Sequence, residues 1–214
     1  MGQLEFQGVL IEHLSHAAFK ISGSGITIYV DPFEIEKEFR DGDIIICTHD
    51  HYDHCSPEDV HKVSKREGVI VASVNCKSKI EKLGFTHHLL EPGNKIEVKG
   101  VTIEAVPAYN IGKRFHPRDY KGIGVIIGIG GIRIYHAGDT DYIPEMKDLK
   151  GKVDIALLPV SGTYVMTAEE AVKAALDIEP KIAVPMHYGV IVGSTADAEM
   201  FKKKLEGKVR VEII

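Results

Sequence analysis

The chain has 214 residues, 44% of them hydrophobic, and a formal net charge of -5 at pH 7. This length and composition suit a single domain, residues 1–214, with a substantial core. The negative charge argues against a protein that follows a phosphate backbone, so we do not expect a nucleic-acid partner. No stretch approaches the roughly 18 uninterrupted apolar residues of a membrane span, so no membrane partner is expected either.

The cysteines bear on the compartment. Cys47, Cys55 and Cys76 are odd in number and irregular in spacing, which does not suit a disulfide framework and favours a reducing compartment. The first residues lack the basic flank of a secretory signal, so we expect a cytoplasmic protein. A thiolate can bind zinc, but we interpret Cys55 as a small buried residue.

Apolar runs and helix caps predict the elements in chain order. Residues 26–30 form a strand-like run that ends at Asp31, and residues 44–48 form a second. Ser56, Pro57 and two acidic residues predict a helix that runs to about Glu67, before Gly68. A second helix is expected at about 77–83. Further strands are expected at 69–73, 95–98, 101–106, 124–129, 132–135, 155–159 and 182–185.

Two more helices close the pattern. Thr167 opens a capping box for a helix that runs to about Asp177, and residues 196–205 read as the last helix. Two groups of strands, each followed by helices, suit an α/β sandwich of two mixed sheets with helices on the outer faces. In such a sandwich, side chains that follow the strands converge on one edge.

The densest chemical feature follows the second of these strands. Three histidines and an aspartate, His49, His51, Asp53 and His54, stand within six residues. Imidazole and carboxylate are the ligands of a catalytic metal site. If the segment is extended, alternating side chains would let it serve two metals, with His49 and His51 on one and Asp53 and His54 on the other.

This H-x-H-x-D-H spacing resembles the motif of the metallo-β-lactamase superfamily, and the likeness runs from about His13 to about Gly193. The segment around Gly138-Asp139-Thr140 resembles the family's bridging carboxylate, and the apolar run that ends at His187 resembles its last ligand on the second metal. The residues near His16 and the strand that ends at Asp31 resemble the family's opening, where the aspartate supports a ligand histidine. The resemblance implies a four-layer αββα sandwich.

One position departs from the family's pattern. Most relatives supply a third histidine to the first metal where this chain has Asn110. Three alternatives are open: Asn110 binds weakly through its amide oxygen, His116 takes the place, or the first site is loose or empty. We favour His116. The surrounding residues are similar to a small-hydrolase branch that includes the ascorbate-phosphate lactonase-like proteins.

The resemblance implies a metal-dependent hydrolase. One or two divalent ions per chain would turn a bound water into the nucleophile, a metal-bound hydroxide oriented by Asp53 or Asp139. Zinc is expected first, with manganese or iron as alternatives. Two other functions stay open: a metal-dependent nuclease or phosphodiesterase, and a non-catalytic protein that binds a metal and a ligand.

A cationic loop gives a guess at the substrate. Lys113 and Arg118 flank the third-ligand region, so a small anionic substrate, either a phosphoester or a phosphorylated lactone, would meet them. Tyr164 either lines the pocket or packs. His16 and His136 are close to the expected ligands, and each could equally support the site or belong to the core. A homo-oligomer is compatible with these features.

Overall fold

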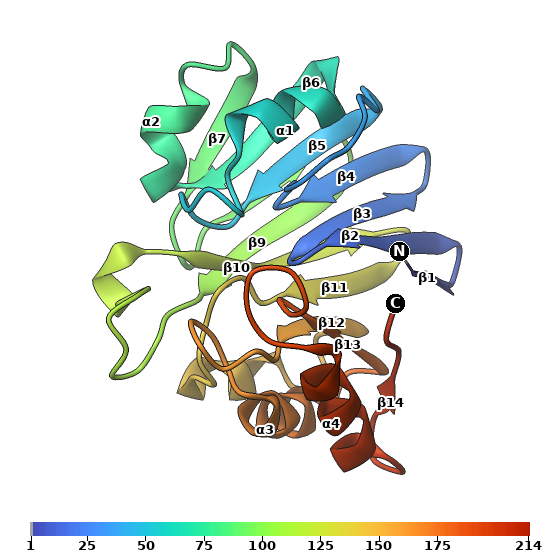
Figure 1. Ribbon diagram of the computed structural model, residues 1–214. Coiled ribbons are helices and arrows are strands. Elements are labelled where there is room, and N and C mark those ends of the chain that lie inside the picture. Colours follow the sequence, from blue (N-terminus) through green and yellow to red (C-terminus); the bar gives the residue numbers. More distant parts are fainter. Residues whose placement is uncertain (1) are drawn as a thin grey trace.

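The computed structural model describes residues 2–214 and has four layers. Helices α1 and α2 cover one face of a first sheet, a second sheet packs on its other face, and helices α3 and α4 cover the outside of the second sheet (Figure 1). The predicted αββα sandwich is therefore confirmed. Each half of the chain supplies one sheet of seven strands.

The first sheet runs in sequence order, and its first four strands are antiparallel, while β4 to β7 are parallel. Its strands are β1 (Gln3–Phe6), β2 (Val9–Ser15), β3 (Ala18–Gly23), β4 (Ile26–Val30), β5 (Gly42–Cys47), β6 (Ser64–Ser73) and β7 (Thr86–Leu90).

The second sheet repeats this pattern, with four antiparallel strands followed by parallel pairs. Its strands are β8 (Lys95–Val98), β9 (Val101–Pro107), β10 (Ile123–Ile129), β11 (Ile132–His136), β12 (Ile155–Pro159), β13 (Ile182–Met186) and β14 (Arg210–Val211). The two halves therefore share a topology.

Four α-helices occur within residues 2–214: α1 (Pro57–Val63), α2 (Lys77–Ile80), α3 (Ala168–Ile178) and α4 (Thr195–Leu205). Three short 3-10 helices are η1 (Val74–Cys76), η2 (Arg118–Tyr120) and η3 (Pro144–Leu149). The predicted caps are present, because Ser56 accepts from the backbone of Asp59, and Thr167 and Glu170 form a capping box. The two longest helices, α3 and α4, begin within one residue of their predicted starts.

The first two helices end earlier than predicted. The helix expected to reach Glu67 ends at Val63, and the next residue, Ser64, is extended and pairs with Gly42 of β5. Ser64 thus begins β6 instead of continuing the helix, and pairing with β5 resumes only at Val69, opposite Ile44, after a register shift. The helix expected at 77–83 ends at Ile80, and Leu83 closes a turn on it.

Strand β5 is buried on both faces, between the second sheet on one side and the helices α1 and α2 on the other. Ile44 and Ile46 belong to the core between the sheets, whereas Ile45 and Cys47 belong to a smaller core beneath α1 and α2. Successive side chains of a strand point to opposite faces, so the continuous apolar run satisfies both cores at once. The segment that follows β5 therefore starts from a rigid support.

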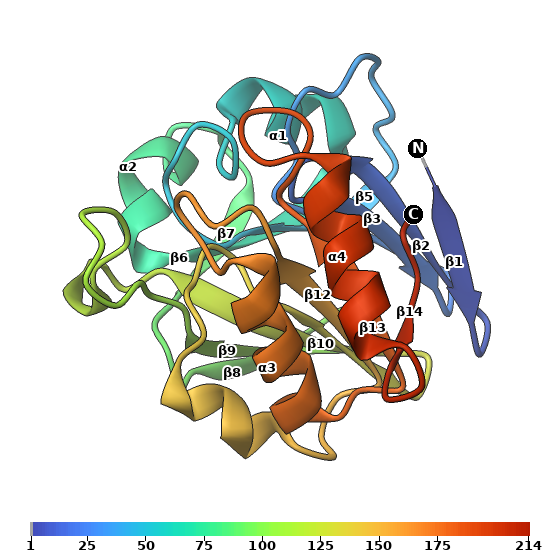
Figure 2. The same cartoon turned by 60° about the horizontal axis from the view of Figure 1, so that its bottom comes forward.

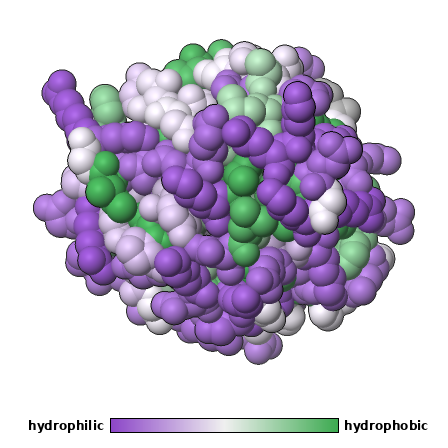
Figure 3. Space-filling view, turned by 90° about the horizontal axis from the view of Figure 1, so that it is seen from below, coloured by the Kyte–Doolittle hydropathy of each residue, from purple (hydrophilic) through white to green (hydrophobic). Residues whose placement is uncertain are grey.

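The outer helices present polar faces to solvent. The side of the molecule that carries α3 and α4 is mostly hydrophilic, with small hydrophobic areas between charged residues (Figure 3). Within residues 2–214, no helix is both long and apolar enough to cross a membrane.

The inter-sheet core generates a stability prediction. Ile127, on the interior strand β10, is fully buried. Its replacement by alanine should lower the free energy of unfolding by about 2–5 kcal/mol, because a cavity replaces packed methyl groups. The control Leu176→Ala, at a 37% exposed side chain on α3, should change it by less than about 0.5 kcal/mol. Urea unfolding measures both, and equal losses would contradict this account of the core.

Candidate metal centre

The chemically active side chains gather where strands of both sheets end. Asp31 follows β4, the His49–His54 segment follows β5, Asp139 follows β11 and His187 follows β13. These are carboxyl ends of parallel or mixed strands, which point to the same edge of the sandwich (Figure 2). The turn between β2 and β3 brings His16 to the same place.

The segment from His49 to His54 is not extended, so the expectation that alternation would divide its side chains is wrong. It forms bends and turns, in which the backbone amides of His54 and Cys55 donate to His51. The turn still places His49 and His51 in one group and Asp53 and His54 in another, although the rings of His49 and His54 are only 4.0 Å apart, centroid to centroid.

The first group consists of His49, His51 and His116. The Nδ1 atom of His51 lies 3.1 Å from Nε2 of His49 and 2.9 Å from Nε2 of His116. Nitrogen ligands on a tetrahedral zinc ion are separated by about 3.3 Å, given metal–nitrogen bonds of roughly 2.0–2.1 Å. The three nitrogen atoms therefore fit one metal ion.

Hydrogen bonds identify which nitrogen atom of His116 is free. The amide of Asn110 donates to the carbonyl oxygens of Phe115 and Tyr164, which uses both of its hydrogens. His116 Nδ1 lies 3.3 Å from the same Tyr164 carbonyl and can donate to it. This tautomer leaves the Nε2 lone pair directed at His51, as a ligand histidine requires.

Asn110 thus holds the loop that carries His116. Its backbone amide also donates to the carbonyl of His116, at 2.7 Å. The structure brings His116 to His49 and His51. The Asn110 amide nitrogen faces carbonyls of the surrounding loops, and its Oδ1 is buried without a hydrogen-bond partner among residues 2–214. Of the alternatives, the geometry favours His116.

The second group consists of His16, Asp53, His54 and His187, whose ligand atoms all lie within 4.8 Å of one another. The Nε2 atoms of His54 and His187 are buried and have no hydrogen-bond partner among residues 2–214. Nδ1 of His187 contacts the hydroxyl of Ser161, at 3.1 Å. Buried, unpaired nitrogen atoms that face a carboxylate fit a second metal ion.

Asp139 lies between the two groups. Its Oδ1 is 3.2 Å from Nε2 of His54, and its Oδ2 is 3.2 Å from Nε2 of His187. The same Oδ2 lies 3.6 Å from His116 and 3.9 Å from His49. One carboxylate therefore contacts members of both groups, which is the placement of a bridging ligand.

Asp31 orients the histidines from behind. Its buried carboxylate accepts hydrogen bonds from the Thr48 amide and hydroxyl, at 2.8 and 2.7 Å, and from His54 Nδ1, at 2.7 Å. Because the Thr48 hydroxyl donates to Asp31, it accepts from His49 Nδ1, at 3.1 Å. Asp31 therefore directs the Nε2 atoms of both histidines into the site.

The electrostatics differ among the histidines. Burial alone would lower the pKa of His54, but the carboxylates of Asp139 and Asp31 hold it well above its ordinary value. Burial lowers the pKa of His49 well below its ordinary value, and burial followed by repulsion from His187 and His54 lowers the pKa of His16 to about 3. Burial alone would raise the pKa of Asp139, but the neighbouring His187 and His54 hold it well below its usual range. Neutral imidazoles and an ionised carboxylate are the forms that bind metals.

Four of the eleven non-glycine residues with a positive φ among residues 2–214 belong to this site. His16, Asp31, His116 and His187 all have a positive φ, between 46° and 60°. Such conformations cost non-glycine residues roughly 1–3 kcal/mol each and are held only when surrounding contacts demand them. The His187 amide donates to the His16 carbonyl, at 2.8 Å, and the Asp31 amide donates to Ile46, at 2.8 Å. The fold thus holds these strained residues in place.

Three predicted residues lie away from the cavity. His136 is buried in the core, where its Nε2 lies 2.9 Å from the Ala17 carbonyl. Lys113 binds Asp141, at 2.5 Å, and the carbonyl oxygens of Gly162 and Val165. Arg118 pairs with Glu145 and lies over the Tyr109 ring. Both cations are therefore engaged in the surrounding loops.

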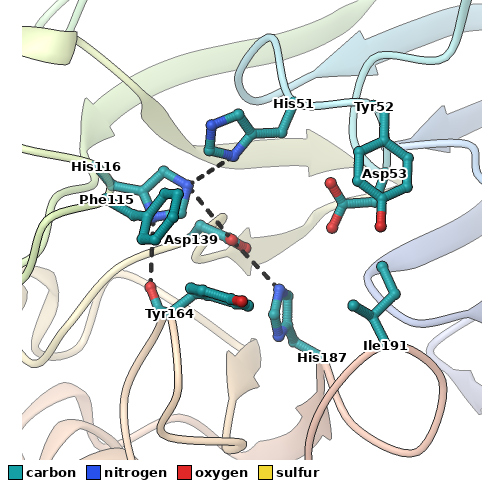
Figure 4. Close-up of a pocket in the computed structure, with 9 residues that line it drawn as sticks. All are labelled: His51, Tyr52, Asp53, Phe115, His116, Asp139, Tyr164, His187 and Ile191. Carbon is teal, nitrogen blue, oxygen red and sulfur yellow. Dashed lines mark hydrogen bonds and ion pairs between the residues drawn. The ribbon is translucent and has the colours of Figure 1, made fainter.

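A cavity of about 220 Å³ opens over the two groups. Side chains of the two groups and Asp139 form its floor, and Tyr52, Phe115, Tyr164 and Ile191 form its walls (Figure 4). Tyr164 therefore does line the pocket. None of the nine lining residues is a lysine or arginine. The sequence reasoning missed the other three wall residues, since an apolar residue in a loop carries no signal of its function.

Two supporting residues were also missed. Thr48 and Ser161 hydrogen-bond the Nδ1 atoms of His49 and His187. Thr48 directly follows β5 and precedes His49, so its position could have indicated the role. Ser161 is 26 residues from His187 in the chain, and only the parallel pairing of β12 with β13 brings them together.

Comparisons with known proteins agree with this geometry. Residues 10–187 match the family model of the beta-lactamase superfamily domain. A UPF0173 metal-dependent hydrolase from Pyrococcus abyssi is 35% identical over 219 residues, with 96% of each chain covered. Another from Thermoplasma volcanium is 38% identical over 204 residues, covering 87% of this chain and 86% of that protein.

Solved structures show the same likeness. A crystal structure from Parabacteroides distasonis has a TM-score of 0.83 and 34% identity, and covers 99% of this chain and 96% of that one. Igni18, a metallo hydrolase from Ignicoccus hospitalis, has a TM-score of 0.81 and 25% identity, with 96% and 94% covered.

The chain belongs to the metallo-β-lactamase superfamily. The prediction of a metal-dependent hydrolase of this superfamily is confirmed at that level.

The geometry of the first group generates a prediction. His116→Ala should weaken metal binding at the first group by more than about 100-fold, because an imidazole ligand is lost. Asn110→Ala should weaken it by only about 10–100-fold, as is usual for supporting residues. Competition with a chromophoric chelator measures both affinities. The opposite ranking would make the Asn110 oxygen the ligand.

Proposed function

We propose that this protein hydrolyses a small phosphoester with the help of one or two divalent metal ions bound by the two groups. The observation that carries the proposal is the position of Asp139 between them, within 3.9 Å of a histidine from each. Metal ions held there would lower the pKa of a bound water to roughly 7 and polarise the electrophile.

The chain's own residues position the reactants. Asp53 faces the cavity (Figure 4), so its carboxylate can accept a hydrogen bond from the attacking water and orient it. Asp139 is buried behind it and contacts both histidine groups, which keeps their spacing constant.

A phosphoester fits the charge distribution better than a phosphorylated lactone, the other substrate that the sequence suggests. At the metal groups, the negative charge of a phosphoester would be neutralised by the ions themselves. The phosphate of a lactone would lie away from its scissile bond, where no lysine or arginine lines the cavity. Both substrates are small anions, as expected from the resemblance.

The metal and the compartment are also proposals. Histidine and carboxylate without thiolate suit zinc, with manganese or iron as alternatives. The cytoplasm is proposed because three cysteines at irregular spacing suit a reducing compartment. A homo-oligomer stays a prediction that gel filtration would test.

Metal content and phosphoester hydrolysis test this function together. We expect elemental analysis to find up to two metals per chain and hydrolysis of bis(p-nitrophenyl) phosphate to depend on them. Asp139→Asn should lower kcat by at least about 100-fold, because the shared carboxylate loses its charge.

Asp148→Asn, an exposed aspartate on η3, serves as the control and should retain full activity. Metal binding without hydrolysis of phosphomonoesters, phosphodiesters or lactones would overturn the proposal in favour of a binding protein. Cleavage of oligonucleotides in preference to small phosphoesters would instead indicate a nuclease.

A further inference from the structure

His16 is a buried imidazole without an evident structural partner. It is 1% exposed, and neither ring nitrogen has a hydrogen-bond partner among residues 2–214. An unpaired polar group in the interior costs roughly 1–3 kcal/mol. By contrast, buried His136 has both ring nitrogens within hydrogen-bond distance of a backbone group, one of Ala17 and one of Gly138.

The backbone holds the His16 ring against the second group. His16 is strained, with a φ of 47°, and its carbonyl accepts from the His187 amide, at 2.8 Å. Its ring lies 3.8 Å from the His187 ring, centroid to centroid, and its Nε2 lies 3.6 Å from Asp53 Oδ2. A strained residue whose unpaired nitrogen faces a carboxylate has the features of a ligand.

We propose that His16 is a direct ligand of the second metal, in addition to Asp53, His54 and His187. This inference rests on the metal binding of the proposed function but not on its substrate. With Asp139, the second group would then offer five side chains, one more than a tetrahedral zinc ion takes. Such a set suits a metal that accepts more than four ligands, such as manganese or iron.

Metal titration of two His16 variants tests the assignment. His16→Phe keeps an aromatic ring beside His187 but removes the nitrogen, and His16→Asn keeps a residue type that tolerates a positive φ. In both, the second equivalent of metal should bind more than about 100-fold more weakly, a larger loss than supporting residues cause. The visible spectrum of the cobalt-loaded protein should change with it.

His136→Ala is the matched control, because it removes a buried histidine from the same region and should leave the cobalt spectrum unchanged. Circular dichroism confirms that each variant is folded. Wild-type affinity and an unchanged spectrum in a folded His16→Phe or His16→Asn variant would show that the ring only packs, and would overturn the proposal.

A second, independent observation concerns the mouth of the cavity. Six large hydrophobic side chains are exposed among residues 2–214, and three of them, Tyr52, Phe115 and Ile191, line the cavity. Val190 adjoins Ile191, and Ile111 lies in the loop that leads to Phe115. Exposed apolar groups that cluster in this way mark a binding surface.

The walls of the cavity are apolar and stand on two opposite sides of its opening. Tyr52 is 62% exposed and Phe115 is 44% exposed, so both side chains have surface to bury. The Phe115 ring stands nearly perpendicular to that of Tyr164, at 5.0 Å, which forms one side of the opening. Ile191 and Tyr52 form the opposite side (Figure 4). A flat apolar group can lie between these sides while its attached phosphoryl group reaches the floor.

We infer that the substrate carries an apolar, preferably aromatic, group on the oxygen of its phosphoester. This inference rests on the proposed function and narrows its substrate class. The occupant is part of the substrate rather than a second protein, because the apolar walls are continuous with the metal-ligating floor of one small cavity.

Binding of two phosphonates to the metal-loaded protein tests the inference without turnover. Phenylphosphonate should bind about tenfold more tightly than methylphosphonate, since burial of the ring against the walls adds apolar contact. Phe115→Ala and Ile191→Ala should each reduce this ratio, while Leu176→Ala, at a similarly exposed leucine on α3, should not.

The outcomes separate the two proposals. If neither phosphonate binds, the phosphoester function fails. If both bind equally, the function stands and the apolar substrate group is wrong. If Phe115→Ala leaves the ratio unchanged but lowers the molecular mass seen in gel filtration, the walls are an interface between copies of the chain, and the inference is overturned.

Discussion

The buried carboxylate of Asp31 is the constraint on which the site depends. It joins the end of β4 to the residue after β5 through the backbone and hydroxyl of Thr48, and it binds His54 directly. His49, through the Thr48 hydroxyl, and His54, directly, thereby acquire fixed tautomers and directions. A fully buried carboxylate is stable in this position only because it accepts hydrogen bonds from three donors.

The sandwich explains why strained residues occur at this edge. Strands of both sheets end at the same edge, and their loops must turn sharply to direct ligands inward. Four of the residues with a positive φ, including His16 and His187, belong to this edge. The rigid, doubly buried β5 and its neighbours supply the packing that keeps them strained. Stability in the sheets thus supports a precise but costly site.

The charged residues in the loops around the cavity hold the loops together, and the apolar residues form the walls of the cavity. Lys113 and Arg118, the cations that seemed suited to an anionic substrate, instead bind carboxylates and carbonyls that hold the loops together. The cavity itself has ionisable groups only on its metal-ligating floor, apart from the phenols of Tyr52 and Tyr164. Recognition of charge would therefore fall to the metals, and recognition of shape to the walls.

The sequence by itself determined the family, the layered fold and the ligand types, because buried strands and metal sites need residue patterns that can be recognised along the chain. The spacing of His49, His51, Asp53 and His54 is such a pattern, and so are the caps at Ser56 and Thr167. Only the tertiary structure decided that His116 lies with the first group, that His16 faces the second, and that α1 yields to β6 at Ser64. These outcomes depend on contacts between segments far apart in the chain, which local patterns do not encode.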